Sequence, residues 1–366
     1  MAKKRVLVLG CTGSIGSQTL DIIRNEKDLF ECAGISAGKN IAKVENLCKE
    51  FNCPGTVFSR DGIEGLKQLI NSSKPDIAVN GVAGSAGLLP SILCLENKID
   101  LALANKETVV MAWDYVKNLA LSKGASIIPV DSEHSAIFNL TQNFGMEKLS
   151  QIVITASGGP FREYTKEMLK TVTVEQALKH PTWNMGGKIT IDSASLANKG
   201  LEVIEAVRLF NMNPDNVQVV VHPQSLIHSL VRTKDGMLYA QISNPSMKHP
   251  IFGALVWPEY KENYMEQFDL FGSTMTFFKP DTELFPMLKI AYECARKSNC
   301  YTVAYNAANE VAVQAFFDKK INFIQIPELV EKTLQKDFSL FPKDLETILE
   351  MDKCARNTAE NLLCQL

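Results

Sequence analysis

The sequence predicts an α/β protein that begins with a doubly wound parallel sheet. A short buried strand, Lys4 to Leu9, leads directly into a glycine-rich turn, and four further apolar runs follow it with helical patterns between them. Strands and helices that alternate in this way form parallel sheets with helices on both faces. The five expected strands are residues 4–9, 30–36, 76–79, 101–104 and 127–130.

The middle and the end of the chain predict other architectures. Strand patterns at 151–156, 217–221, 226–232 and 237–242, the last two joined by a turn ending in Gly236, indicate an α+β region with an antiparallel sheet. Residues 257–282 contain aromatics, glycine and proline without periodicity and predict a connecting arm. Beyond Glu283 the pattern is helical, which predicts a small C-terminal helical bundle.

Composition narrows the functional classes. The chain has 366 residues, of which 46% are hydrophobic and 22% charged, and its net charge is −3. This balance offers no electrostatic basis for binding nucleic acid or an anionic membrane. The apolar run from Val6 to Leu9 is too short for a signal peptide, and no stretch is long enough to span a membrane. Nine scattered cysteines indicate reduced thiols and a cytoplasmic protein.

Two acids close the fifth expected strand. Asp131 and Glu133 follow the apolar run Ser126 to Val130, and in extended backbone their side chains would point to the same side. Two neighbouring carboxylates repel each other unless a proton or cation lies between them. Oxygen ligands favour a hard divalent ion such as Mg²⁺ or Mn²⁺. A solvated strand end with two acids is the alternative.

The glycine turn after the first strand predicts a nucleotide site. Gly10, Gly13 and Gly16 let the backbone turn tightly and approach a pyrophosphate, while Thr12 and Ser14 can donate to its oxygens. The spacing G-x-x-G-x-x-G differs from the more familiar G-x-G-x-x-G. Its place between a strand and a helix favours a nucleotide site over an ordinary turn.

The end of the second strand indicates which nucleotide binds. An NAD-specific site has an acid there, whereas this chain has Ser36 followed by Gly38, Lys39 and Asn40. A lysine attracts a 2′-phosphate, so the sequence favours NADPH. A solvated loop lysine is the alternative.

A polar helix face forms the third candidate site. Asn198 and Lys199 precede Glu202 by four and three positions, so the three side chains share one face, opposite the apolar Ile204 and Val207. We expect that face to be exposed and able to bind phosphate and metal. A simple ion pair between Lys199 and Glu202 is the alternative.

Eight motifs along the chain occur together in one family. The chain resembles the 1-deoxy-D-xylulose 5-phosphate reductoisomerases over essentially its whole length. The motifs that carry this resemblance are residues 10–16, 37–40, 104–107, 129–134, 157–161, 180–202, 221–225 and 306–310. One departure is Gly187, which stands beside Lys188 where a second basic residue is common.

The resemblance implies a fold and a reaction. The fold would be a Rossmann-like NADPH domain (1–125), a catalytic α+β domain (126–257) with a lid at about 158–188, a linker (258–282) and a C-terminal helical domain (283–366). The reaction would be the NADPH-dependent isomerisation and reduction of 1-deoxy-D-xylulose 5-phosphate to 2-C-methyl-D-erythritol 4-phosphate in the non-mevalonate isoprenoid pathway. The resemblance also implies a homodimer.

The resemblance assigns residues to three sets of ligands. Asp131, Glu133 and Glu202 would hold Mg²⁺, Mn²⁺ or Co²⁺. The substrate would contact Lys106, Ser132, Ser157, His180, Trp183, Ser193, Asn198 and Lys199. NADPH would contact the turn from Gly10 to Gly16, including Thr12, Gly13, Ser14 and Ile15, and also Gly38, Lys39, Asn40, Asn105, Glu107 and Gly186.

Two other functions are compatible with part of the pattern. An NADP-dependent dehydrogenase of another sugar phosphate needs no site with three carboxylates, so its turnover would survive exhaustive chelation. A non-catalytic nucleotide sensor or scaffold would not need Asp131, Glu133, Glu202, Lys106 and His180.

Overall fold

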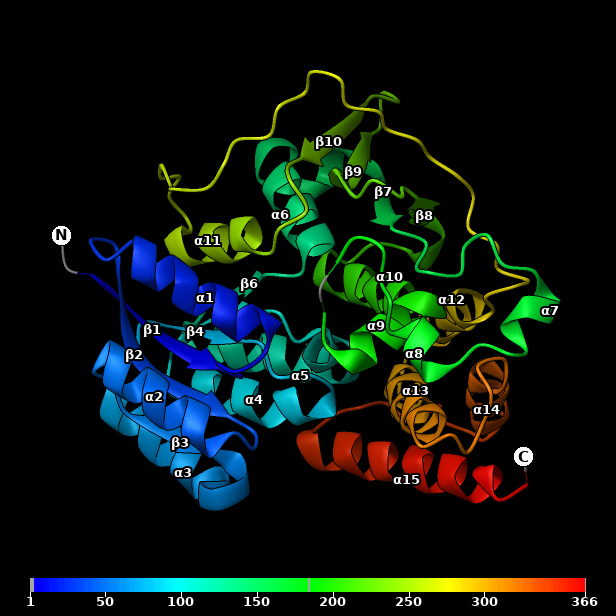
Figure 1. The fold of residues 1–366 in the computed structure, drawn as a ribbon, viewed down its shortest axis with the longest axis horizontal. Helices are drawn as coiled ribbons and strands as arrows, with labels where there is room; N and C mark the ends of the chain where they lie inside the picture. Colours follow the sequence, from blue (N-terminus) through cyan, green and yellow to red (C-terminus); the bar gives the residue numbers. More distant parts are fainter. Residues whose placement is uncertain (1–2, 184, 366) are drawn as a thin grey trace. The chain divides into compact units, whose positions relative to one another are not determined.

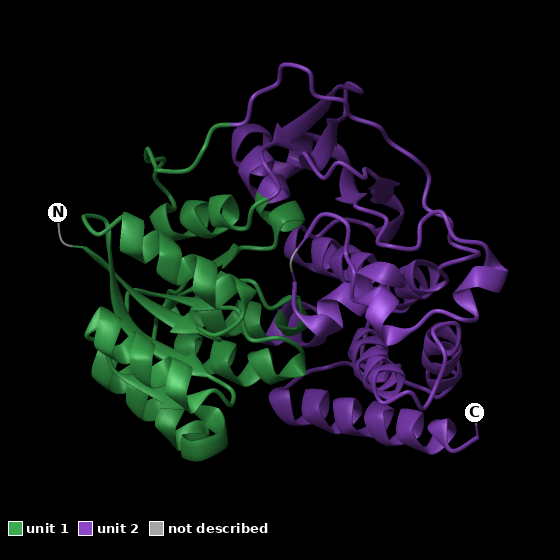
Figure 2. Ribbon diagram, viewed as in Figure 1, with its two compact units in different colours: residues 1–108, 116–135, 246–267 green, residues 109–115, 136–245, 268–366 purple. Residues whose placement is uncertain are grey.

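The computed structural model describes residues 3–183 and 185–365, so the motif residue Asn184 lies outside the described part. The chain divides into two compact units (Figure 2). Unit 1 comprises residues up to 108 together with 116–135 and 246–267. Unit 2 comprises residues 109–115, 136–245 and 268–366. Each unit has a sheet of its own.

Unit 1 is built on a six-stranded parallel sheet in the order β3-β2-β1-β4-β5-β6 (Figure 1). This order, which reverses next to β1, is that of doubly wound nucleotide-binding folds and confirms the predicted class. The strands are β1 (Lys4–Leu9), β2 (Phe30–Ala37), β3 (Gly55–Val57), β4 (Ile77–Asn80), β5 (Asp100–Leu103) and β6 (Ile127–Pro129). The prediction missed β3, which has only three residues.

Helices follow the strands of unit 1 as the alternating pattern predicts. Their amphipathic faces bury apolar residues, such as Leu20 and Ile23 of the first helix, against the sheet. The helices are α1 (Ser14–Asn25), α2 (Ile41–Phe51), α3 (Phe58–Ser73), α4 (Leu88–Glu96), α5 (Lys106–Lys123), α6 (Ser132–Phe144) and α11 (Lys248–Val256). Residues of α5 and α6 are shared between the two units.

Unit 2 contains a four-stranded sheet in the order β10-β9-β7-β8. Its strands are β7 (Leu149–Ala156), β8 (Val217–Val221), β9 (Ile227–Thr233) and β10 (Leu238–Ile242). The predicted hairpin between β9 and β10 is confirmed, and Gly236 at its turn has a φ of +90°. The expectation of a purely antiparallel sheet is wrong, because β7 and β8 pair in parallel. A long helical connection between these strands makes that pairing possible.

The helices of unit 2 share one hydrophobic core with its sheet. Ile152 of the sheet, Leu201 of the middle segment and Tyr305 of the C-terminal segment belong to the same buried cluster. The helical C-terminal region is therefore confirmed, whereas the domain boundaries at 125, 257 and 282 stay predictions. The helices are α7 (Lys166–Leu169), α8 (Val174–Ala177), α9 (Gly187–Ala194), α10 (Ala197–Leu209), α12 (Met287–Lys297), α13 (Tyr301–Phe317), α14 (Gln325–Thr333) and α15 (Leu345–Leu363).

The segment 257–282 is irregular, as predicted, and contributes one isolated bridge, between Phe278 and Val221. Within residues 3–183 and 185–365, no helix has the length and apolar character that a bilayer crossing requires.

Candidate functional site

The glycine turn of unit 1 closes tightly on its own backbone. Gly10 has a φ of +81°, and a Cβ there would lie 2.9 Å from the carbonyl oxygen of Gly81. A Cβ at Gly16 would lie 2.3 Å from the carbonyl oxygen of Gly10. Only glycine fits these two positions. Gly13 is the N-cap residue of α1 and has no side chain to cap it, so the helix presents its N-terminal amides as an anion site requires.

The end of β2 lies against this turn. The Ser36 carbonyl oxygen accepts hydrogen bonds from the backbone of Gly10 and Cys11, at 2.9 and 2.8 Å. Lys39 is exposed just beyond the strand, and Asn40 caps α2 by accepting from the Lys43 amide at 3.0 Å. The residues predicted to bind the pyrophosphate and those predicted to bind the 2′-phosphate therefore lie on neighbouring loops of one unit.

Sequence reasoning missed Lys43. Its Nζ donates to the Thr12 carbonyl oxygen at 3.3 Å, which places a second cation beside the glycine turn. The signal was available, because Lys43 lies in the first turn of the helix that Asn40 caps.

Asn105 has a structural role in addition to its predicted one. It is buried, and its Oδ1 caps α5 by accepting from Thr108 N at 3.0 Å. Its Nδ2 donates to the Val82 and Gly84 carbonyl oxygens, both at 2.8 Å, and to Glu107 Oε2 at 2.9 Å. The side chain thus fixes the loop after β4, next to the point where the strand order of the sheet reverses. The contact between Asn105 and NADPH stays a prediction.

The two predicted metal-ligand acids of unit 1 lie close together, although not through strand geometry. β6 ends at Pro129, and the Asp131 carbonyl oxygen accepts from the Ser135 amide at 2.7 Å at the start of α6. The expectation of extended backbone is therefore wrong, because α6 begins at Ser132. A carboxylate oxygen of Asp131 and one of Glu133 still lie within 4.8 Å of each other.

Lys106 lies beside this pair of acids. Its Nζ is 2.6 Å from Asp131 Oδ2, and its side chain is 6% exposed. The two residues meet because β5 and β6 are adjacent parallel strands whose carboxyl ends share one edge. Ser132 Oγ donates to Glu133 Oε2 at 2.5 Å, which orients the second carboxylate.

Ser157 and His180 of unit 2 form a hydrogen-bonded pair. His180 Nδ1 accepts from the backbone amides of Thr182 and Trp183, at 3.1 and 2.9 Å. A neutral ring that accepts at Nδ1 carries its proton on Nε2, so Nε2 donates to Ser157 Oγ at 2.9 Å. Burial lowers the pKa of His180 to about 4, which agrees with the neutral form.

The root of the predicted lid packs against the helix that carries Ser193. Gly159 has a φ of +67°, and a Cβ there would lie 2.8 Å from the Ser193 carbonyl oxygen. Its amide also donates to Ser157 Oγ at 3.3 Å. The structure therefore brings Ser157, His180 and the backbone of Ser193 together within unit 2.

The polar side chains of α10 contact one another as predicted, but they are more buried than we expected. Asn198 Nδ2 donates to Glu202 Oε1 at 2.5 Å, and Lys199 pairs with Glu202 Oε2. Lys199 and Glu202 are 5% and 1% exposed, so the expectation of an exposed face is wrong. Glu202 is thus a buried carboxylate that accepts from an amide and a lysine. A buried charge requires such partners in well-defined positions, whereas a solvated ion pair does not.

His222 is structural in this unit. Its Nδ1 donates to the Thr276 carbonyl oxygen at 2.9 Å, while its Nε2 accepts from two backbone amides at 3.2 Å. The ring is fully buried and anchors the arm to the end of β8.

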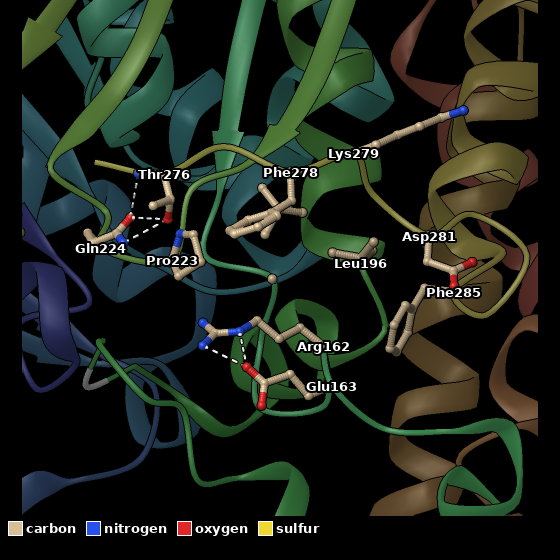
Figure 3. A pocket seen from close by; sticks show the side chains of 12 residues that line it. Arg162, Glu163, Leu196, Pro223, Gln224, Thr276, Phe278, Lys279, Asp281 and Phe285 are labelled. Atoms are coloured by element: carbon tan, nitrogen blue, oxygen red, sulfur yellow. Dashed lines mark hydrogen bonds and ion pairs between the residues drawn. The ribbon is translucent and has the colours of Figure 1, made fainter. Parts of the chain in front are cut away.

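A pocket of about 360 Å³ opens at the lid root (Figure 3). Leu196, Phe278 and Phe285 line it together with the Arg162–Glu163 ion pair. None of the residues that line it is a predicted ligand, so this pocket is not the centre of the predicted chemistry.

The fold defines a nucleotide-binding α/β protein, in which unit 1 carries paired carboxylates beside Lys106 and unit 2 carries a cluster of polar side chains. Family models match most of the chain: the 1-deoxy-D-xylulose 5-phosphate reductoisomerase model over residues 6–61 and 56–113, and its C-terminal domain models over 127–210 and 242–358. The chain belongs to the 1-deoxy-D-xylulose 5-phosphate reductoisomerase family.

Relatives and solved structures of this family match from end to end. The reductoisomerase of Treponema denticola is 45% identical, covering 98% of this chain and 97% of its own length. That of Treponema pallidum is 43% identical, covering 100% and 99%. The Zymomonas mobilis enzyme in complex with NADPH has a TM-score of 0.89 at 36% identity, with both chains fully covered. A reductoisomerase in complex with NADPH, fosmidomycin and magnesium has a TM-score of 0.91 at 34% identity, covering 99% of this chain and 98% of that chain.

Proposed function

We propose that this chain catalyses the NADPH- and divalent-metal-dependent isomerisation and reduction of 1-deoxy-D-xylulose 5-phosphate to 2-C-methyl-D-erythritol 4-phosphate, the committed step of the non-mevalonate isoprenoid pathway. Membership of the family over the whole chain supports the reaction. The observation that carries it is the approach of the Asp131 and Glu133 carboxylates to within 4.8 Å, beside Lys106. A plain dehydrogenase has no use for such an acidic site.

Asp131, Glu133 and Glu202 would hold the cation. The first two would supply oxygen donors from the start of α6, and the buried Glu202 would supply the third. A set made only of carboxylates fits Mg²⁺ or Mn²⁺ and also accepts Co²⁺. When bound, the metal would act as a Lewis acid on the ketone and the adjacent hydroxyl of the substrate.

Lys106 and Ser132 would bind the reacting end of the substrate. Lys106 is held by Asp131 with its ammonium group directed toward the acidic site, and Ser132 is held by Glu133. In these positions they can donate to a carbonyl or hydroxyl oxygen on which negative charge develops. Because their partners are the metal-ligand acids, cation binding and substrate orientation would be coupled.

The polar cluster of unit 2 would bind the phosphate of the substrate. Neutral His180 and Ser157 offer donors at the root of the lid, and Ser193, Asn198 and Lys199 would complete the set. Trp183, whose amide bonds to His180, would cover the substrate when the lid from 158 to 188 closes. Phosphate binding at a distance from the reacting carbons would provide energy for that closure, which excludes water from the intermediate.

NADPH would bind at the glycine turn and at the end of β2. Its pyrophosphate would lie over Gly10 to Gly16, and its 2′-phosphate beside Gly38, Lys39 and Asn40. We assign further contacts to Asn105, Glu107 and Gly186. We also expect the protein to be cytoplasmic and to form a homodimer. Light scattering of the purified protein checks the homodimer.

The test is an assay of NADPH oxidation with deoxyxylulose phosphate as the substrate. We expect turnover that exhaustive chelation abolishes and added Mg²⁺ or Mn²⁺ restores, with methylerythritol phosphate as the product. Turnover that persists after chelation would instead favour a dehydrogenase of another sugar phosphate. Nucleotide binding without any turnover would favour the sensor hypothesis.

A further inference from the structure

The motif from Asn306 to Glu310 has no part in the proposed chemistry, yet it reaches the helix that carries Ser193. Asn309 lies on α13 and is fully buried. Its Nδ2 donates to Asp192 Oδ1 at 2.8 Å, and Asp192 lies on α9 with only 1% of its surface exposed. A carboxylate can only accept, so this contact also determines which way the amide of Asn309 faces.

The second oxygen of Asp192 has a charged partner. Lys188 Nζ donates to Asp192 Oδ2 at 2.9 Å, one helical turn earlier on α9. Lys188 is also the last residue of the predicted lid. The buried carboxylate therefore joins the lid end at Lys188 and the helix α9, which carries Ser193, to α13 of the C-terminal region. A buried charge that loses one such partner destabilises its surroundings strongly.

Close packing leaves α9 little freedom to adjust. A Cβ at Gly187 would lie 3.1 Å from the Phe317 ring of α13, and a Cβ at Gly159 would lie 2.8 Å from the Ser193 carbonyl oxygen. A second basic residue is common at position 187, but in this chain the Gly187 backbone packs closely against Phe317 of α13. Neighbouring residues of a helix point about 100° apart, so a rotation of α9 that releases Asp192 also turns Ser193 away.

We propose that Asn309 and Asp192 are positioning residues that hold α9 in the rotation required for Ser193 and the lid end to receive the substrate phosphate. This inference rests on the proposed function. Neither residue touches the substrate; each acts through α9. Their loss therefore affects substrate binding more than the chemical step.

The experiment compares kinetic constants of the full-length enzyme and its variants. In N309L the carboxylate loses its neutral donor, and we expect the KM for deoxyxylulose phosphate to rise about tenfold or more, with a smaller change in kcat. In N309D two carboxylates face each other, so the rise is larger. The exchange variant D192N/N309D restores an amide–carboxylate pair, and we expect its KM to fall below that of N309D.

The matched control is N306L. Asn306 is equally buried on α13, but its Nδ2 donates to Glu310 Oε1 at 3.3 Å and to Met111 Sδ at 3.5 Å, and among the described residues it has no hydrogen bond to α9. We expect N306L to lower the melting temperature while leaving the KM within about twofold of wild type.

Three results overturn the inference: a KM for N309L that stays near the wild-type value, an equal rise in N306L, or an exchange variant whose KM is no lower than that of N309D. Failure of the proposed function itself gives a different result, because the wild-type protein would then not oxidise NADPH with this substrate.

Discussion

Two buried lysine–carboxylate pairs, one in each unit, differ in how the chain builds them. Lys106 and Asp131 of unit 1 meet because two parallel strands end at the same edge of a sheet. Lys199 and Glu202 of unit 2 meet within one turn of a single helix. The first pair depends on sheet topology and the second on local geometry. In both pairs a buried lysine lies against a carboxylate, which is itself fully buried only in Glu202.

The largest effect is expected at the helical pair. We predict that Glu202→Gln lowers the metal-supported rate by about 100-fold or more, because a neutral amide is a poor ligand for a hard cation. The affinity for NADPH should stay near normal. Steady-state kinetics with titrated Mn²⁺ and a separate NADPH binding titration check this. An equal loss of cofactor affinity would contradict the assignment of Glu202 as a metal ligand.

The pair of Lys106 and Asp131 should contribute to the stability of the protein, because its lysine is buried. Asp131→Asn removes the carboxylate that lies 2.6 Å from the buried Lys106 ammonium group, and we expect a loss of about 3 kcal/mol in the free energy of unfolding of the metal-free protein. Urea denaturation measures it. The exposed pair of Lys261 and Glu259, 2.7 Å apart, is the control, and Glu259→Gln should cost less than about 1 kcal/mol. Equal losses would show that burial does not distinguish these pairs.

The lid root of unit 2 offers a test that involves no charge. We predict that Gly159→Ala raises the KM for the substrate about tenfold, because its φ of +67° is strained for alanine and the added Cβ would press on the Ser193 carbonyl oxygen. Gly253→Ala is the control, since nothing lies within 4 Å of its Cβ position in α11. A tolerated Gly159→Ala would show that the lid root can move away from α9.

A smaller effect is expected at the cofactor end of unit 1. Lys39→Ala should raise the KM for NADPH several-fold, because the 2′-phosphate loses one contact with a positive charge. The KM for NADH should stay nearly unchanged, because NADH has no 2′-phosphate. Lys43→Ala is the matched variant, because Lys43 is committed to the Thr12 carbonyl oxygen. If only Lys43→Ala alters the preference between the two nucleotides, the 2′-phosphate lies beside Lys43.

The last comparison concerns stability and not rate, and it is a pH dependence at His180. Its pKa is lowered by burial to about 4, from an ordinary value near 6.5. The unfolded chain therefore binds more protons than the folded one between these values, so the stability contributed by neutral His180 is present above pH 6.5 and is lost as the pH falls toward 4. We expect the melting temperature of wild type to fall more steeply over this range than that of His180→Gln. Parallel curves would contradict the buried neutral ring.

Sequence periodicity was most informative where local rules govern structure. The strand from Lys4 to Leu9, the glycine turn and the hairpin at Gly236 were predicted, because hydrophobic runs and turn residues act over a few positions. β3 was missed because three residues carry no periodicity. The parallel pairing of β7 with β8 was missed because strand neighbours far apart in sequence leave no local pattern.

The amino-acid sequence by itself determined the residue types of the site and their family: the acids at 131 and 133, the lysines, the glycine spacing and the helix face of Glu202. Tertiary structure alone decided how these groups are presented. It turned the acid pair onto a helix start instead of a strand, buried Lys199 and Glu202, and paired Asn309 with Asp192. The physical reason is that residue chemistry and short-range spacing are written in the chain, whereas burial and the partner of each charge depend on which distant segments pack together.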